Sequence, residues 1–193
     1  MTEPATSITV PLGCGVDARL PLRWVDDHTG IYSFVLLGNV AWVRACATSL
    51  MEAIDDALDG ETVDIILTPE AKAITLAYEL CVRMSLNEFV VARKSRKVYM
   101  VDPVHVPVNS ITTAAEQELW FGQGAINRLR GKRILVVDDV ISTGATMQAI
   151  FDFLHSIDCT ILLVACALTE GEQRDNFQGV PLISIGHLPL AKR

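Results

Sequence analysis

Apolar positions along the chain follow two different spacings. Between Asn39 and Gly60 they recur at the spacing of a helix face, which predicts a helix that Asn39 can cap and Gly60 can end. The same spacing predicts further helices over about 74–82 and 147–154. Several short runs are apolar throughout and rich in β-branched residues, as is typical of buried strands: 63–67, 89–92, 134–137, 160–168 and 182–185.

These elements predict an α/β fold with a mainly parallel sheet flanked by helices. Strands that are apolar over their whole length are buried on both faces, and the helices between them provide that cover. The chain has 193 residues, which suits one domain, so we expect a single domain over 1–193. Prolines and glycines punctuate residues 1–38, which predicts an irregular segment there, ahead of an α/β core at 39–193.

The segment 101–116 follows neither spacing. Valines alternate with other residues over 104–108, while Pro103 and Pro107 oppose a central strand. This pattern predicts either a two-stranded flap that closes as a mobile lid or an ordinary surface hairpin.

The charge balance excludes some classes of protein. Sixteen basic residues stand against 23 acidic ones, a formal net charge of -7, whereas a nucleic-acid-binding protein needs a basic face. No apolar run is long enough to span a bilayer, and Glu3 lies where a secretory signal carries positive charge. We therefore expect a cytoplasmic protein that binds neither nucleic acid nor membrane.

Cysteines and histidines give no sign of a metal site. The five cysteines are odd in number and show no CxxC spacing, and Cys46, Cys81 and Cys166 lie in apolar stretches. We expect reduced, buried thiols that act as small apolar residues. The four histidines are scattered, with no HExxH motif, so the sequence supports no zinc site.

The end of the apolar run 134–137 carries the strongest chemical signal. Two acids, Asp138 and Asp139, follow it directly, and after two apolar residues come Ser142, Thr143, Gly144, Ala145 and Thr146, ahead of a predicted helix. Hydroxyls, a glycine that allows a tight turn, and the free N–H groups of a helix start together favour phosphate. The acids would repel phosphate, so they fit sugar hydroxyls or a divalent cation carried by the ligand.

The acids could instead merely cap the next helix, but two adjacent carboxylates at the end of an apolar strand are costly unless paired. Two familiar phosphate motifs are absent from the sequence. No GxxxxGK[ST] occurs, and Gly122-Gln123-Gly124 fails as a dinucleotide fingerprint because Asn127 stands where a further glycine is needed.

The stretch from Val136 to Thr146 resembles the phosphoribosyl-pyrophosphate (PRPP) binding loop of the type I phosphoribosyltransferases. The resemblance, weaker over the rest of 63–168, implies that Asp138 and Asp139 are catalytic acids that hold the ribose hydroxyls. It also implies that the turn 142–146 binds the 5′-phosphate. Mg²⁺ would arrive with PRPP, with no direct protein ligand, and the two acids would reach it through water.

The resemblance assigns a role to two more strand ends. Thr68, Pro69, Glu70, Ala71 and Lys72 follow the run 63–67 at the place of the family's pyrophosphate loop; a proline in the first turn of a helix is the alternative. The run Arg93-Lys94-Ser95-Arg96-Lys97 resembles the basic segment of adenine and xanthine phosphoribosyltransferases. Arg93, Lys94 and Lys97 would bind pyrophosphate, unless the run is simply a solvated surface. A homodimer is implied too, because such segments reach a partner's site.

Residues around the base are less well defined by the resemblance. Ile141 could pack on the base, and Trp42 and Trp120 could stack on a purine, although a core tryptophan is commoner. Residues 1–38 occupy the place of the family's hood over the base. Adenine phosphoribosyltransferases carry a glutamate early in the lid, where Thr113 stands here and Glu116 follows three residues later.

The expected function is a purine phosphoribosyltransferase that joins a nucleobase to PRPP and releases pyrophosphate, with adenine as the leading base. Xanthine, hypoxanthine and a pyrimidine are alternative bases. A PRPP-sensing purine regulator without catalysis is the alternative from another class. Only about 38 residues precede the first core helix, and they show no helix–turn–helix pattern, which disfavours the regulator.

Overall fold

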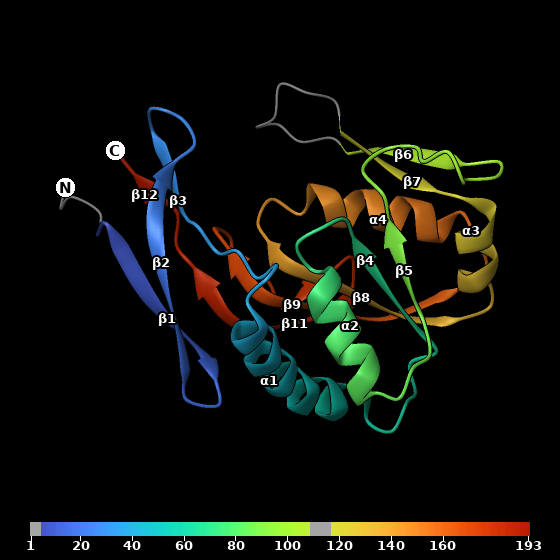
Figure 1. Ribbon diagram of the computed structural model, residues 1–193, viewed down its shortest axis with the longest axis horizontal. Helices are drawn as coiled ribbons and strands as arrows, with labels where there is room; N and C mark the ends of the chain where they lie inside the picture. Colours follow the sequence, from blue (N-terminus) through green and yellow to red (C-terminus); the bar gives the residue numbers. More distant parts are fainter. Residues whose placement is uncertain (1–4, 109–116) are drawn as a thin grey trace.

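A six-stranded sheet forms the centre of the computed structural model, which describes residues 5–108 and 117–193 (Figure 1). Its strands lie in the order β10-β11-β9-β8-β4-β5, and all neighbours are parallel except β10 and β11. The bounds are β4 Ile65–Pro69, β5 Phe89–Ala92, β8 Arg133–Ile141, β9 Thr160–Glu170, β10 Asn176–Phe177 and β11 Val180–Leu188. The predicted mainly parallel sheet is confirmed.

Helices cover both faces of this sheet. Helices α1 (Val40–Leu58) and α2 (Ile74–Arg83) lie on one face, and α3 (Gln123–Leu129) and α4 (Ala145–His155) lie on the other (Figure 1). Asn39 caps α1 as predicted, since its side chain accepts a hydrogen bond from the Trp42 N–H. Alternate residues of β8 pack into the apolar clusters on the two faces of the sheet, because side chains along a strand point to opposite faces. The α/β class is therefore confirmed.

The pattern of one helix between successive strands fails in one place. β9 and β11 are parallel neighbours, yet only residues 171–179, with the short strand β10, connect them. The sequence also gave no indication of α3, whose seven residues are too few to show a clear apolar period. In α2, Tyr78 and Val82 are exposed, because the helix buries Leu76 and Leu80 instead.

The amino-terminal segment is not irregular. Strands β1 (Ser7–Gly13), β2 (Val16–Trp24) and β3 (Thr29–Tyr32) form an antiparallel sheet with β12 (Ala191–Lys192). Prolines misled the prediction: Pro11 lies in β1, an edge strand of this sheet, where a missing N–H is tolerated. This second sheet stands at one end of the molecule beside α1 (Figure 1).

The segment 101–116 contributes only one strand of a hairpin, and the second strand lies beyond the predicted bounds. Strands β6 (Val104–Val108) and β7 (Gln117–Phe121) pair antiparallel over α4, and a single bridge from Arg93 to Trp120 joins the hairpin to the end of β5. Thr113 and Glu116 lie outside the described residues. Lid closure stays a prediction. Within 5–108 and 117–193, the helices are too short or too polar to cross a bilayer.

Candidate active site

Asp138 and Asp139 lie inside a strand rather than after it. β8 continues through both acids to Ile141, and Asp138 pairs in register with Cys166 of β9. The sequence pattern ended the strand at Val137 because acids are unusual in a buried strand. The two acids are only 8% and 5% exposed. Such burial of carboxylates is costly unless a partner or ligand compensates it.

The surroundings of Asp138 raise its pKa. Burial, followed by the negative charge of Asp139, raises the pKa of Asp138. The Asp139 N–H donates a hydrogen bond to Oδ1 of Asp138 at 2.8 Å, and the charge of Lys72 favours ionisation. Oδ2 of Asp139 lies 3.4 Å from Nζ of Lys72. That oxygen is buried and accepts no hydrogen bond among the described residues, so it is free to accept one from a ligand.

The turn 142–146 forms a cup at the start of α4. Gly144 has a φ of +83°, a conformation that favours glycine, and α4 begins at the next residue. Neither acid caps this helix, and no side-chain cap is present at its start in the described structure, which excludes the capping alternative. The cup encloses a cavity of about 120 Å³ lined by 140–147 together with Asp138. A helix start of this kind binds phosphate through its free N–H groups.

A second cavity, of about 150 Å³, joins residues from three parts of the chain. It is lined by Pro69, Glu70, Ala71, Lys72, Lys94, Asp138, Asp139, Val140 and Thr146. The acids, the loop after β4, one basic residue after β5 and the turn before α4 therefore share one hollow. Thr68 does not line it, because this residue is fully buried within β4.

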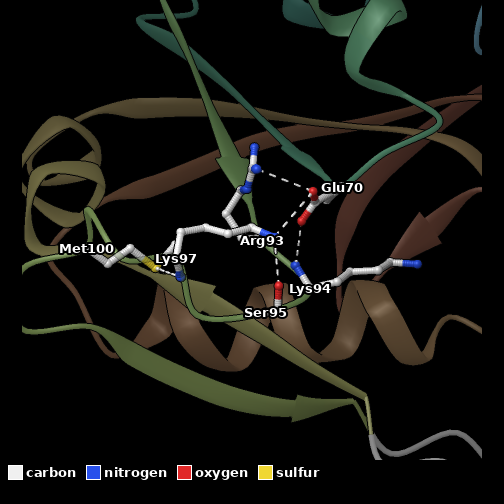
Figure 2. A network of polar contacts seen from close by, with 6 residues as sticks. All are labelled: Glu70, Arg93, Lys94, Ser95, Lys97 and Met100. Carbon is white, nitrogen blue, oxygen red and sulfur yellow. Dashed lines mark hydrogen bonds and ion pairs between the residues drawn. The ribbon is translucent and has the colours of Figure 1, made fainter.

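The basic run after β5 divides into two groups. Arg93 and Lys97 form ion pairs with Glu70, with N–O distances of 3.4 and 4.0 Å. Figure 2 shows the Lys94 side chain leaving this network in the other direction, while its backbone N–H donates to Glu70 at 2.9 Å. Of the three residues of this basic run that were assigned to pyrophosphate, only Lys94 lines the cavity of the acids, which Lys72 of the loop after β4 lines as well.

Residues proposed for the base lie in packed surroundings. Ile141 borders the phosphate cup but is only 3% exposed and belongs to the apolar cluster around α4. Its contact with a base stays a prediction. Trp42 stacks on Phe34, and Trp120 stacks on His105, so both tryptophans serve packing and neither lines the two cavities.

Two residues near the site were missed by the sequence analysis. Arg174 backs the phosphate cup from outside, since its guanidinium donates to the Thr143 carbonyl and lies against Gly144. Glu170 ends β9 and is 7% exposed; burial raises its pKa, and the Ser142 hydroxyl and the charges of Lys72 and His187 oppose that rise. Glu170 could have been found as the first acid after an apolar strand, whereas Arg174 has no local signal.

The donor set fits a Mg²⁺ ion that is held mainly by the ligand. The described residues contain no group of three or more His, Cys, Asp or Glu side chains able to enclose a metal. Two carboxylates with one unpartnered oxygen are suitable hard donors for a shared ion. Asp138 and Asp139 would hold such an ion, which would neutralise negative charge on the ligand, and Lys72 already faces Asp139.

Comparisons with known proteins agree with this geometry. Residues 36–182 match the family model described as the phosphoribosyl transferase domain. The match covers more than half of the chain, so the chain belongs to this family. The hypoxanthine/guanine phosphoribosyltransferases of Methanothermus fervidus and Methanotorris igneus are 34% and 31% identical to it, over 65% and 69% of this chain. The match spans 62% of the first relative and 67% of the second.

Solved structures of adenine phosphoribosyltransferases share the fold. The enzyme of Thermoanaerobacter pseudethanolicus superposes with a TM-score of 0.63 at 21% identity, covering 81% of this chain and 95% of that one. The Saccharomyces cerevisiae enzyme, solved with adenine and an imino-sugar bisphosphate, gives a TM-score of 0.65 at 15% identity and covers 93% of both chains. These likenesses support the mainly parallel sheet with its additional antiparallel sheet.

Proposed function

We propose that this protein is a purine phosphoribosyltransferase that joins a 6-oxopurine, hypoxanthine or guanine, to PRPP and releases pyrophosphate. The carrying observation is the cavity in which Asp138 and Asp139 meet Lys72, Lys94 and Thr146. A phosphorylated sugar needs hydroxyl acceptors and a phosphate cup, and its leaving group needs cations. This cavity and the adjoining cup supply all three.

The base assignment differs from the adenine expected from the sequence. Relatives named as hypoxanthine/guanine phosphoribosyltransferases match at 30–34% identity, whereas the adenine phosphoribosyltransferase of Thermoanaerobacter pseudethanolicus matches at 28%. This favours the hypoxanthine alternative. Adenine remains the second candidate, because the similar solved structures are mostly adenine phosphoribosyltransferases.

The residues of the site would act mainly by position and charge. The turn 142–146 would hold the 5′-phosphate, and Asp138 and Asp139 would accept hydrogen bonds from the ribose hydroxyls. Lys72 and Lys94 would stabilise the negative charge that develops as the bond from C1 to pyrophosphate breaks, with its electron pair leaving on oxygen. The base nitrogen would then form the new bond to C1, and its proton would pass to the released pyrophosphate. Mg²⁺ bound with PRPP would supply further charge neutralisation.

The protein would work as a homodimer. Large apolar side chains are exposed in the segment after the edge strand β5 and on α2: Val98, Tyr99 and Val101 in the first, and Tyr78 and Val82 in the second. Exposed apolar groups of this kind mark association surfaces. Light scattering of the wild type and of a Tyr99→Glu variant would test this, with loss of a wild-type dimer in the variant as the expected result.

A base panel tests the activity itself. The protein is incubated with PRPP, Mg²⁺ and one of adenine, hypoxanthine, guanine, xanthine or uracil, and nucleotide and pyrophosphate are measured. We expect inosine or guanosine monophosphate with equimolar pyrophosphate. Adenosine monophosphate alone would transfer the assignment to adenine. Tight binding of PRPP without a product from any base would favour the regulator.

A further inference from the structure

Glu70 is an acid in an unexpected place. It lines the cavity assigned to pyrophosphate, where a free carboxylate would repel the ligand. Its side chain is 21% exposed and faces three groups of the basic run at once (Figure 2). Oε1 lies 3.4 Å from the Arg93 guanidinium and 4.0 Å from the Lys97 ammonium, and Oε2 accepts the Lys94 backbone N–H.

Among the described residues, Glu70 is the acid that forms ion pairs with both Arg93 and Lys97. Nζ of Lys97 also donates to Ser95 Oγ at 2.7 Å, and the Lys97 N–H points to the sulfur of Met100. Nε of Arg93 is buried and makes no hydrogen bond among the described residues, so Glu70 is the anion that this guanidinium faces there. Neither residue lines the cavity that holds the two aspartates.

Lys94 is held in the opposite way. Its backbone N–H donates to Glu70, but its exposed side chain leads away from the network (Figure 2). Lys94 also lines the cavity together with Lys72 and Asp139. One carboxylate therefore joins the loop after β4 to the turn after β5. The same carboxylate forms ion pairs with two cations of the run, and the side chain of the third forms none with it.

We propose that Glu70 is a positioning residue that gives the basic residues of this run different roles. It directs Lys94 into the cavity, while Arg93 and Lys97 neutralise Glu70 and do not contact the leaving group. This inference rests on the proposed function, since it concerns the ligands of pyrophosphate. It differs from the sequence-based assignment of Arg93, Lys94 and Lys97 to pyrophosphate, because it keeps only Lys94 as a ligand.

A double-mutant cycle separates neutralisation from direct contact. Calorimetry with Mg²⁺ and PRPP, and separately with Mg²⁺ and inorganic pyrophosphate, gives the affinity of Arg93→Met, Glu70→Gln and the double variant. Arg93→Met should weaken binding by about tenfold, because it exposes the charge of Glu70. The double variant should bind within about twofold of Glu70→Gln alone, because no charge is left to neutralise. If Arg93→Met still weakened binding by about tenfold in the chain that carries Glu70→Gln, Arg93 would contact the ligand directly, and the proposal would be overturned.

A pair of substitutions at Glu70 tests positioning. Glutamine keeps an oxygen that accepts the Lys94 N–H, whereas alanine does not. Glu70→Ala should raise the KM for PRPP by about tenfold and Glu70→Gln by no more than about twofold, with kcat altered less than KM in both. Equal effects of the two variants would contradict the positioning role. Thermal unfolding checks that each variant is folded.

Two further variants complete the design. Lys94→Met should weaken pyrophosphate binding by about tenfold, both in the wild-type chain and in the chain that already carries Glu70→Gln. Arg96→Met is the matched control, because Arg96 is an exposed arginine of the same run outside the contacts drawn around Glu70, and it should change affinity by less than about twofold. If the wild type bound neither PRPP nor pyrophosphate, the proposed function would fail together with this inference. If the wild type bound both ligands but the double-mutant cycle did not give the expected result, only the role of Glu70 would be overturned.

Discussion

The ammonium of Lys72 lies 3.4 Å from Oδ2 of Asp139, so the loop after β4 meets the acids of β8 across the candidate active site. Lys72 belongs to the side of the site assigned to the leaving group, and Asp139 to the side assigned to the ribose. The C1 atom of the ribose, which exchanges pyrophosphate for the base, would lie between these two sides of the site. The pair therefore lies where the bond between the ribose and pyrophosphate would break, with positive charge developing on the ribose and negative charge on pyrophosphate.

Replacing Lys72 by methionine should weaken PRPP binding. The variant loses a cation from the pyrophosphate side and leaves the buried Asp139 without a counter-ion, so we expect about a tenfold loss of affinity for PRPP with Mg²⁺. Calorimetry measures this loss. Lys132→Met serves as the control, since Lys132 is exposed before β8 and should leave the affinity unchanged. Equal affinities of the Lys72 and Lys132 variants would remove Lys72 from the site.

Asp138→Asn should reduce turnover and yet stabilise the unliganded protein at neutral pH. Burial and Asp139 raise the pKa of Asp138 above its ordinary 3.8, so the folded state binds the proton more tightly than the unfolded state. The contribution of Asp138 to stability is then full below pH 3.8 and is lost as pH rises through the folded pKa. Asparagine, which stays neutral, avoids that loss.

Two measurements on Asp138→Asn check this. The urea midpoint at pH 7 should rise, and its advantage over the wild type should shrink toward pH 4. Turnover should fall by about 100-fold, because the transition state loses a fixed negative charge. Asp56→Asn, at an exposed position of α1, should change neither quantity. A lower midpoint for the Asp138 variant would mean that the buried charge is compensated in the free protein.

Gly144→Ala should cost more stability than Gly179→Ala. Both glycines have a φ of +83°, so both substitutions carry the penalty of a left-handed residue, about 1 kcal/mol. A Cβ on Gly144 would also lie 2.7 Å from the Arg174 guanidinium and 2.9 Å from the Phe177 ring, whereas a Cβ on Gly179 meets nothing within 4 Å. Urea unfolding of both variants gives the difference. We also expect weaker PRPP binding only for Gly144→Ala, and equal binding by both would show that the turn does not hold phosphate.

The pair of Asp64 and Arg133 should make stability depend on acid pH. Hydrogen bonds from the Arg133 side chain and backbone lower the pKa of Asp64 to about 2. This pair therefore contributes its full stability above the unfolded pKa near 3.8 and loses it as pH falls toward 2. Asp64→Asn should lower the melting temperature at pH 7 and have little effect near pH 2. An equal fall in melting temperature at pH 7 and near pH 2 would indicate that the charge of Asp64 plays no part.

Local pattern was sufficient for the central layer and for the phosphate turn. The strand 134–137 is recognisable because an unbroken apolar run indicates burial on both faces. The helix after Gly144 is recognisable because consecutive turn residues indicate a helix start. The amino-terminal sheet was not recognisable. Its strands are stabilised by pairing with one another and with β12 at the far end of the chain, and prolines on an edge strand hide that pairing from a local pattern.

The sequence by itself determined the α/β core, the acid pair and the turn that follows it, since each is a short continuous segment whose chemistry depends on its own residues. Only the tertiary structure decided which charges meet. Glu70 takes Arg93 and Lys97, Lys72 faces Asp139, and Arg174 supports the turn at Gly144. These partners lie 23 to 67 residues apart, and ionic contacts act over a few ångströms. Strand order and loop course bring them within that range, and spacing along the chain does not encode either.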